Sequence, residues 1–136
     1  MKNAHAVVWV DHHQAKILGI HVSTGAERDA ELESETLHGP HGQTHNKRHD
    51  DGHRHALDAH FADRIAQALA GATEILVCGP GAAKDELMAH LRAKHAAVAA
   101  KVVAVEAIDH PTEGQLADHA RKAFAKIDRM KGTHVR

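Results

Sequence analysis

The sequence predicts a single α/β domain with a mixed five-stranded sheet flanked by helices. The chain has 136 residues, which is the usual size of one domain. Its first third holds short β-branched or alternating stretches, and from residue 57 onward helical patterns alternate with short apolar runs. We expect residues 1–130 to form the domain and residues 131–136 to be a flexible tail.

The first third of the chain predicts three antiparallel strands. Residues 4–10 are apolar and β-branched, which indicates a buried strand that ends at Asp11. Residues 15–22 return as the second strand of a hairpin, and Ser23-Thr24-Gly25 has the composition of a turn. Residues 30–37 carry glutamates at alternate positions, as is typical of a strand with one solvated face at or near a sheet edge.

The second half of the chain predicts three helices and two strands. The first helix has an apolar stripe formed by Leu57, Phe61, Ile65 and Leu69. We expect this helix to end at Gly71. Residues 74–78 predict a central strand, 82–95 a helix, and 101–107 another strand of the buried type. Thr112 is a suitable cap for a final helix that packs through Leu116, Ala120, Ala123, Phe124 and Ile127. The order β-β-β-α-β-α-β-α is that of a ribonuclease-H-like arrangement.

A polar, histidine-rich loop at residues 38–54 separates the third strand from the first helix. Seven of the sixteen histidines fall between His38 and His60. Gly39-Pro40, Gly42 and Asp51-Gly52 are typical of turns, and no apolar period is present. Connections of this length within a compact domain are usually either functional or disordered. We expect the loop to meet a polar partner.

Composition excludes several classes of function. The net charge is −1 with histidine neutral, so the whole chain exerts no general attraction for polyanions. Aromatic residues make up 2% of the chain, too few for base-stacking platforms. The single Cys78 excludes a disulfide framework. Without an apolar run of about 18 residues or a secretory leader pattern, we expect a cytoplasmic protein with no membrane partner.

Four stretches together resemble a known family: AVVWVDHHQAKIL, the loop HNKRHDDGH, ILVCGPGAAKDEL, and VVAVEAIDHPTEGQLADHARKAF. They resemble the middle domain of eukaryotic and archaeal class 1 peptide-chain release factors and of Pelota. More closely, the chain looks like small bacterial proteins labelled translational machinery proteins, and the resemblance covers nearly the whole chain. It implies a ribosome-associated translation factor, with ribosome rescue or hibernation as candidate roles, whose partner is the ribosome, its RNA or tRNA.

The resemblance also identifies a departure from the family. In release factors, a Gly-Gly-Gln tripeptide on the loop before the first helix promotes peptidyl-tRNA hydrolysis. The corresponding place here is Asp51-Gly52-His53, and the earlier Gly42-Gln43 pair follows His41 instead of a glycine. We therefore expect a non-enzymatic factor with no catalytic residue. A peptidyl-tRNA hydrolase in which His53 replaces the glutamine is a third hypothesis.

The loop offers two kinds of binding site. Basic and polar side chains suited to phosphate contacts predict RNA binding through His45, Asn46, Lys47, Arg48, His49, Gly52, His53 and Arg54. The alternative function is divalent-metal binding, with zinc or nickel as the cofactor. Its ligands would be histidines that recur at every fourth position, His41, His45, His49 and His53, although the nearby glycines and proline disfavour a helix there.

Other chemistry-bearing residues have structural interpretations that compete with functional ones. Gly79, Gly81 and Lys84 could bind an anion before a helix, but a tight strand-to-helix turn is the favoured explanation. Asp11, Asp58 and Asp63 invite two-metal hydrolysis, yet the central strand supplies no further carboxylate, so we expect no nuclease activity. Homodimerisation through the acidic third strand is possible on sequence grounds.

Overall fold

The computed structural model describes residues 5–20, 33–40 and 56–135, with side chains up to residue 130. Its strands are β1 (His5–Val10), β2 (Gln14–Ile20), β3 (Glu33–His38), β4 (Glu74–Gly79) and β5 (Val102–Ala107). Its helices are α1 (Ala59–Leu69), α2 (Ala83–Lys94), α3 (Ala96–Ala99) and α4 (Glu113–Val135). The strands form one sheet in the order β3-β2-β1-β4-β5. The β1–β2 and β2–β3 pairs are antiparallel, and the β1–β4 and β4–β5 pairs are parallel.

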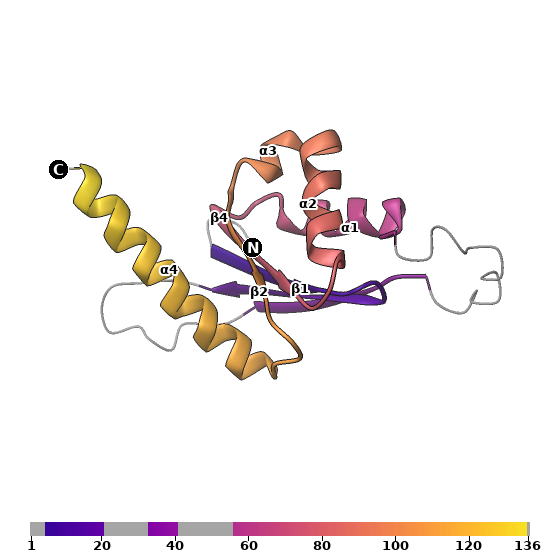
Figure 1. Cartoon of the computed structure of the whole chain (residues 1–136), viewed down its shortest axis with the longest axis horizontal. Coiled ribbons are helices and arrows are strands. Elements are labelled where there is room, and N and C mark those ends of the chain that lie inside the picture. Colours follow the sequence, from indigo (N-terminus) through magenta and orange to yellow (C-terminus); the bar gives the residue numbers. More distant parts are fainter. Residues whose placement is uncertain (1–4, 21–32, 41–55, 136) are drawn as a thin grey trace.

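Helices cover both faces of this sheet, with α1, α2 and α3 on one face and α4 on the other (Figure 1). Alternation along β1 divides the core, because successive side chains of a strand point to opposite faces. Val8 and Val10 pack with α1 and α2, whereas Val7 and Trp9 pack with α4. β1 and β4 lie at the centre of the sheet and are buried on both faces, as their continuous apolar sequences require.

The connections at the ends of the strands are held by side chains. The Asp11 carboxylate accepts hydrogen bonds from the backbone N–H groups of His13 and Gln14, both at 2.8 Å, which fixes the β1–β2 turn. Thr112 and Gln115 form a reciprocal capping box at the start of α4. These hydrogen bonds confirm the predicted turn after Asp11 and the predicted cap at Thr112. Both features could be predicted from the sequence because the interactions are local.

The α/β class and the mixed five-stranded sheet flanked by helices are confirmed, and β3 is an exposed edge strand as predicted. One strand was placed wrongly. The 101–107 segment was predicted to be buried, but β5 is the other sheet edge and Val105 is 37% exposed. Its apolar residues pack on both faces of the sheet, Val102 with the cluster that contains α1 and α2, and Val103 and Ala104 with the cluster that contains α4. The short helix α3 was not predicted, because its four residues are too few to show a helical period.

Two boundaries also differ from the sequence predictions. His38 is the last residue of β3, where its neighbour Leu37 pairs with Ala15 of β2, so the loop predicted at 38–54 begins after it. The α4 backbone is helical to Val135, and the predicted division between domain and tail at residue 130 stays a prediction. Among the residues described, no helix combines the length and hydrophobicity needed to cross a membrane.

Candidate functional site

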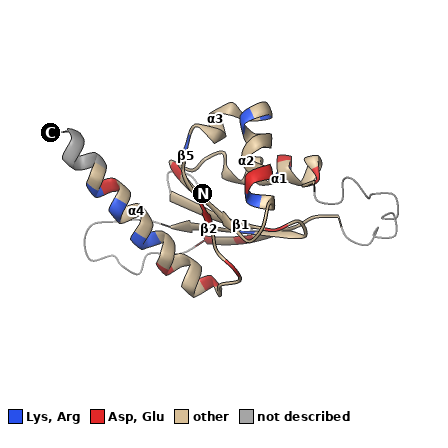
Figure 2. Ribbon diagram, viewed as in Figure 1, with Lys and Arg blue, Asp and Glu red and all other residues tan. Residues whose placement is uncertain are grey.

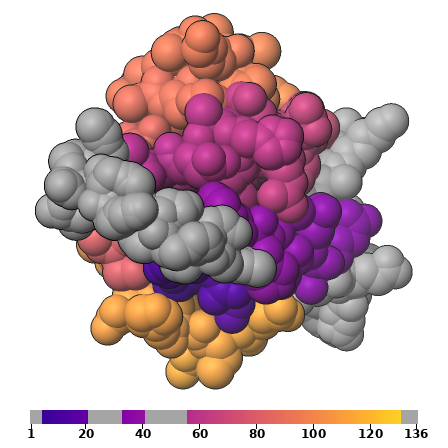
Figure 3. Space-filling model, turned by 90° about the vertical axis from the view of Figure 1, so that its right-hand side faces the viewer, coloured from indigo at the N-terminus to yellow at the C-terminus, as the bar shows by residue number. Residues whose placement is uncertain are grey.

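The predicted RNA-contacting and metal-binding residues of the loop, from His41 to Arg54, lie outside the described residues. The structure does describe the residues on either side of this segment. We call these the loop base: His12 and His13 of the β1–β2 turn, His38–Pro40 after β3, and Leu57–Arg64 at the start of α1. Figure 3 looks at this end of the molecule, where atoms of β3, α1 and the β1–β2 turn lie side by side.

The chain enters the 41–55 segment from a tightly packed position. The Gly39 N–H donates to the His13 carbonyl at 2.8 Å, which continues the hydrogen bonding of the β2–β3 pair. A Cβ at Gly39 would lie 3.1 Å from the Phe61 ring and 3.3 Å from the His12 carbonyl oxygen. The Arg64 guanidinium donates to the His38 carbonyl at 2.9 Å and lies 5.9 Å from the centre of the Phe61 ring. Contacts among the β1–β2 turn, β3 and α1 therefore fix the position of the chain just before residue 41.

The chain leaves the segment through an equally well-defined helix start. The Asp58 carboxylate accepts from the Phe61 backbone N–H at 2.9 Å and caps α1. Leu57 packs against the core beside it, and Phe61 is fully buried. Because Leu37 is also packed on this core, both ends of the segment are attached to the same hydrophobic cluster. Residues 41–55 are thus carried by a framework that is ordered on both sides.

The loop base adjoins the carboxyl ends of β1 and β4, where the strand order changes direction. Open α/β sheets place ligands at such switch points. His12 Nε2 lies 2.7 Å from Glu86 Oε1 and joins the β1–β2 turn to the first turn of α2. The turn that joins β4 to α2 contains Gly79 at φ 154° and Gly81 at φ 64°, both in a region that favours glycine. The geometry supports the interpretation of Gly79-Pro80-Gly81 as a tight strand-to-helix turn.

Lys84 belongs to this turn. Its ammonium donates to the Gly81 carbonyl at 2.5 Å and lies 3.6 Å from the Asp85 carboxylate. Asp85 and Glu86 occupy the first turn of α2, where their charges favour the helix dipole and oppose a bound anion. Anion binding by Gly79, Gly81 and Lys84 stays a prediction, and the hydrogen bond and ion pair described for Lys84 both lie within its own turn and helix.

A second cluster lies between α1 and α2. Asp63 Oδ1 is 2.7 Å from His90 Nε2 and 2.8 Å from His95 Nε2. Hydrogen bonds from His95 and then from His90 lower the pKa of Asp63 from 3.8 to about 2. The carboxylate is therefore ionised throughout the neutral range. Two imidazoles and a carboxylate gathered at one point are a donor set suited to a divalent metal.

The residues considered for hydrolysis occupy different parts of the fold. Asp11 fixes the hairpin turn, Asp58 caps α1, and Asp63 joins the two histidines. Cys78 is buried in β4, and burial raises the pKa of its thiol to about 12, with the charge of Glu106 adding to the shift. At neutral pH this thiol is protonated, which is the state of a core residue and not of a nucleophile.

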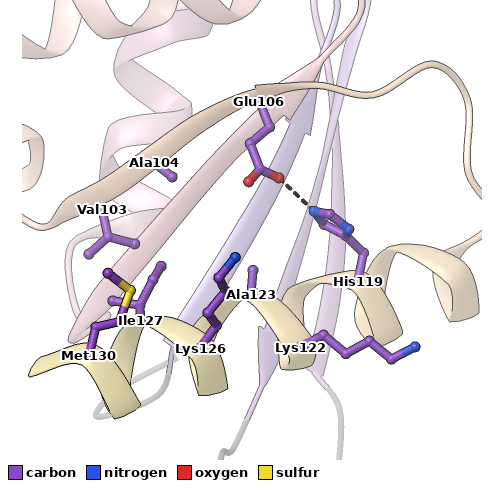
Figure 4. Close-up of a pocket in the computed structure, with 9 residues that line it drawn as sticks. All are labelled: Val103, Ala104, Glu106, His119, Lys122, Ala123, Lys126, Ile127 and Met130. Atoms are coloured by element: carbon purple, nitrogen blue, oxygen red, sulfur yellow. Dashed lines mark hydrogen bonds and ion pairs between the residues drawn. The ribbon is translucent and has the colours of Figure 1, made fainter. Parts of the chain in front are cut away.

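The opposite face of the sheet carries a groove of about 420 Å³ between the β5 edge and α4 (Figure 4). Its apolar lining comes from Val103, Ala104, Ala123, Ile127 and Met130. At one end, the Glu106 carboxylate points to the His119 ring, with 2.5 Å between Oε1 and Nε2. Basic and acidic residues are interspersed along α4 (Figure 2). The groove and the loop base are separate surfaces, because α4 and α1 cover different faces of the sheet.

Sequence reasoning identified neither the His12–Glu86 pair nor the convergence of Asp63, His90 and His95. Asp63 precedes these two histidines by 27 and 32 residues. The histidines are five positions apart, and His95 has left the helix as its C-cap with φ −139°. No helical spacing therefore places them together. The one signal in the sequence is Asp63 itself, a candidate carboxylate ligand for two-metal hydrolysis.

No protein-family model and no curated protein matches this chain, whereas several solved structures do. Pelota from Archaeoglobus fulgidus superimposes with a TM-score of 0.60 and 14% identity, covering 93% of this chain and 33% of that chain. Pelota from Thermoplasma acidophilum superimposes with a TM-score of 0.55 and 19% identity, covering 85% of this chain and 31% of that chain. An archaeal protein superimposes with a TM-score of 0.56 and 17% identity, covering 95% of this chain and 39% of that chain. The chain spans about a third of the length of each Pelota chain. The likeness shows that this chain has a fold found in Pelota, as the sequence resemblance implied.

Proposed function

We propose that this chain is a translation-associated factor that binds ribosomal RNA or tRNA through residues 41–55 and has no catalytic residue of its own. The observation that carries the proposal is the likeness in fold to two archaeal Pelota structures over 85% and 93% of the chain. The sequence resemblance implies a ribosome-associated role. Ribosome rescue and hibernation are the candidate settings.

The loop base supports this function in physical terms. A loop that is held at both ends explores a smaller volume than a free tail, so less conformational entropy is lost when it binds. Gly39, just after β3, and Asp58, the N-cap of α1, hold the two ends close together, because both contact Phe61. Between them the sequence supplies Lys47, Arg48 and Arg54, whose side chains suit phosphate oxygens. In the proposal, the sheet and α1 present the loop while the loop makes the contacts.

Co-sedimentation with purified ribosomes tests the proposal. The variant K47A/R48A/R54A removes three positive charges from the loop, and R121A/K122A/K126A removes three from the exposed surface of α4. We expect the loop variant to leave the ribosomal pellet at moderate salt and the α4 variant to remain with it. If the loop cations contact phosphates, the slope of log affinity against log salt should decrease by roughly 2–3 in the loop variant.

Two results would count against the function. One is the absence of the unaltered chain from ribosomes and from tRNA at all salt concentrations. The other is equal binding by the two charge variants, which would leave the association intact and exclude the loop as its carrier. Replacing His53 by Ala and measuring peptidyl-tRNA hydrolysis tests the absence of catalysis, since a release activity that depends on His53 would contradict it.

A further inference from the structure

The cluster formed by Asp63, His90 and His95 lies on the face of the sheet covered by α1 and α2, and the proposed RNA contacts do not involve it. Each residue contributes one donor atom, and the three atoms lie within 4.8 Å of one another. We propose that these residues form a binding site for a divalent transition-metal ion of the zinc class, with a fourth coordination position open to water.

The distances fit such an ion after a small adjustment. Zinc bonds to imidazole nitrogen and carboxylate oxygen are about 2.0–2.2 Å, so tetrahedral ligands stand roughly 3.3 Å apart. The two histidine nitrogens are now 2.7 and 2.8 Å from Asp63 Oδ1. Each nitrogen–oxygen distance must therefore open by about 0.5 Å, which side-chain rotation can supply without moving either helix.

The backbone holds the three ligands on ordered elements. Asp63 lies within α1, between Ala62 and Ile65, whose side chains are buried. His90 precedes the fully buried Leu91, and the His95 N–H donates to the Leu91 carbonyl at 2.8 Å. Packing of α1 on α2 therefore fixes the distance across the site. A preorganised ligand set binds a metal ion with a smaller loss of conformational entropy.

The electrostatic environment also suits a cation. The Asp63 carboxylate is ionised in the neutral range and supplies a full negative charge, and the C-terminal end of α2 contributes partial negative charge beside His95. Arg92 and Lys94 lie in the same last turn, but both are exposed, so solvent screens their repulsion. The side chains of His90, His95 and Asp63 are 18%, 27% and 43% exposed, which leaves a path for an ion and a place for water.

The other described group of three potential ligands is less suitable. His5 Nε2 is 3.3 Å from Glu74 and 3.8 Å from Asp128, and its ring packs edge-on against Phe124 with centroids 4.6 Å apart. This group offers one imidazole, whereas the α1–α2 cluster offers two. Because imidazole selects zinc-class ions over calcium or magnesium, the α1–α2 cluster is the better site for them.

The test must separate this site from the histidines of the loop. In the full-length chain, the five histidines of residues 41–55 are replaced by asparagine. Zn²⁺ binding to this background is measured by calorimetry, and Co²⁺ binding by its visible absorption. H90Q/H95Q and D63N are then added separately. The matched control is H110Q/H119Q, which removes two exposed histidines that each contact a single carboxylate.

We expect the background and the control to bind one metal ion per chain and to show the absorption of four-coordinate cobalt. H90Q/H95Q and D63N should each weaken binding by at least ~10-fold and remove that absorption. Circular dichroism identifies any variant that fails to fold, and the other variant then decides the outcome. Equal affinity with and without His90 and His95, or no binding by the background, would overturn the proposal.

Discussion

Replacing Gly79 by Ala should disrupt the junction of β1 and β4. A Cβ at this position would lie 2.2 Å from the Val10 carbonyl oxygen, where at least 3.0 Å is needed, so the two strands must separate locally by about 0.8 Å. The backbone at φ 154° adds a conformational cost of roughly 1–3 kcal/mol, and each weakened interstrand hydrogen bond costs about 1 kcal/mol. We expect G79A to lower the free energy of unfolding by at least ~3 kcal/mol.

Gly81 provides a matched control two residues away. Its φ is 64°, but a Cβ there would meet no atom within 4 Å, so G81A should cost only about 1–2 kcal/mol for its left-handed backbone. Urea unfolding followed by circular dichroism gives both values from the shift of the midpoint at constant slope. If G79A is no more destabilising than G81A, the close approach of Gly79 to Val10 does not govern this junction.

Three further predictions concern the core and the α1–α2 cluster. Trp9→Phe removes the indole N–H that donates to the Ile108 and Asp109 carbonyls at 3.2 and 2.7 Å, and should lower the free energy of unfolding in urea by about 1–3 kcal/mol. No loss would mean that these bonds do not stabilise the connection between β5 and α4. The pKa of Asp63 is held at about 2 in the folded chain, below its ordinary 3.8, so its contribution to stability is complete above about pH 4 and is lost as the pH falls through about 2. In EDTA, D63N should flatten the dependence of unfolding free energy on pH in that window, and an unchanged profile would contradict the assignment. The Cys78 thiol, with its pKa raised to about 12 by burial, should react with iodoacetamide at pH 8 only on unfolding, whereas rapid labelling of the native chain would show that β4 is accessible.

The sequence was most informative where structure depends on neighbouring residues. The apolar run of β4, the Phe61 stripe of α1 and the Thr112 cap each follow from local composition, and all three are present. It also predicted a polar loop at residues 38–54 from the absence of an apolar period, and of these residues the structure describes His38 at the end of β3, followed by Gly39 and Pro40. The identity of the loop contacts stays a prediction, since the residues concerned lie outside the described part of the chain.

Long-range arrangement was beyond the reach of composition. An apolar strand has the same sequence character at a sheet centre and at an edge covered by helices, so the sequence predicts a buried β5, whereas among the described strands only β4 pairs with it. In the same way, the sequence spacing of the residues in the loop base and in the α1–α2 cluster does not indicate that they lie together. Gly39 is paired with His13 only through the register of β2 and β3.

The sequence by itself determined the α/β class and the order of the main elements, because hydrophobic period and turn chemistry are set by residues close together in the chain. Only the tertiary structure decided which strand became the second edge and which side chains met at Asp63. Packing of α1 on α2 brings His90 and His95 to a carboxylate 27 and 32 residues earlier in the chain, and such a contact depends on the whole fold.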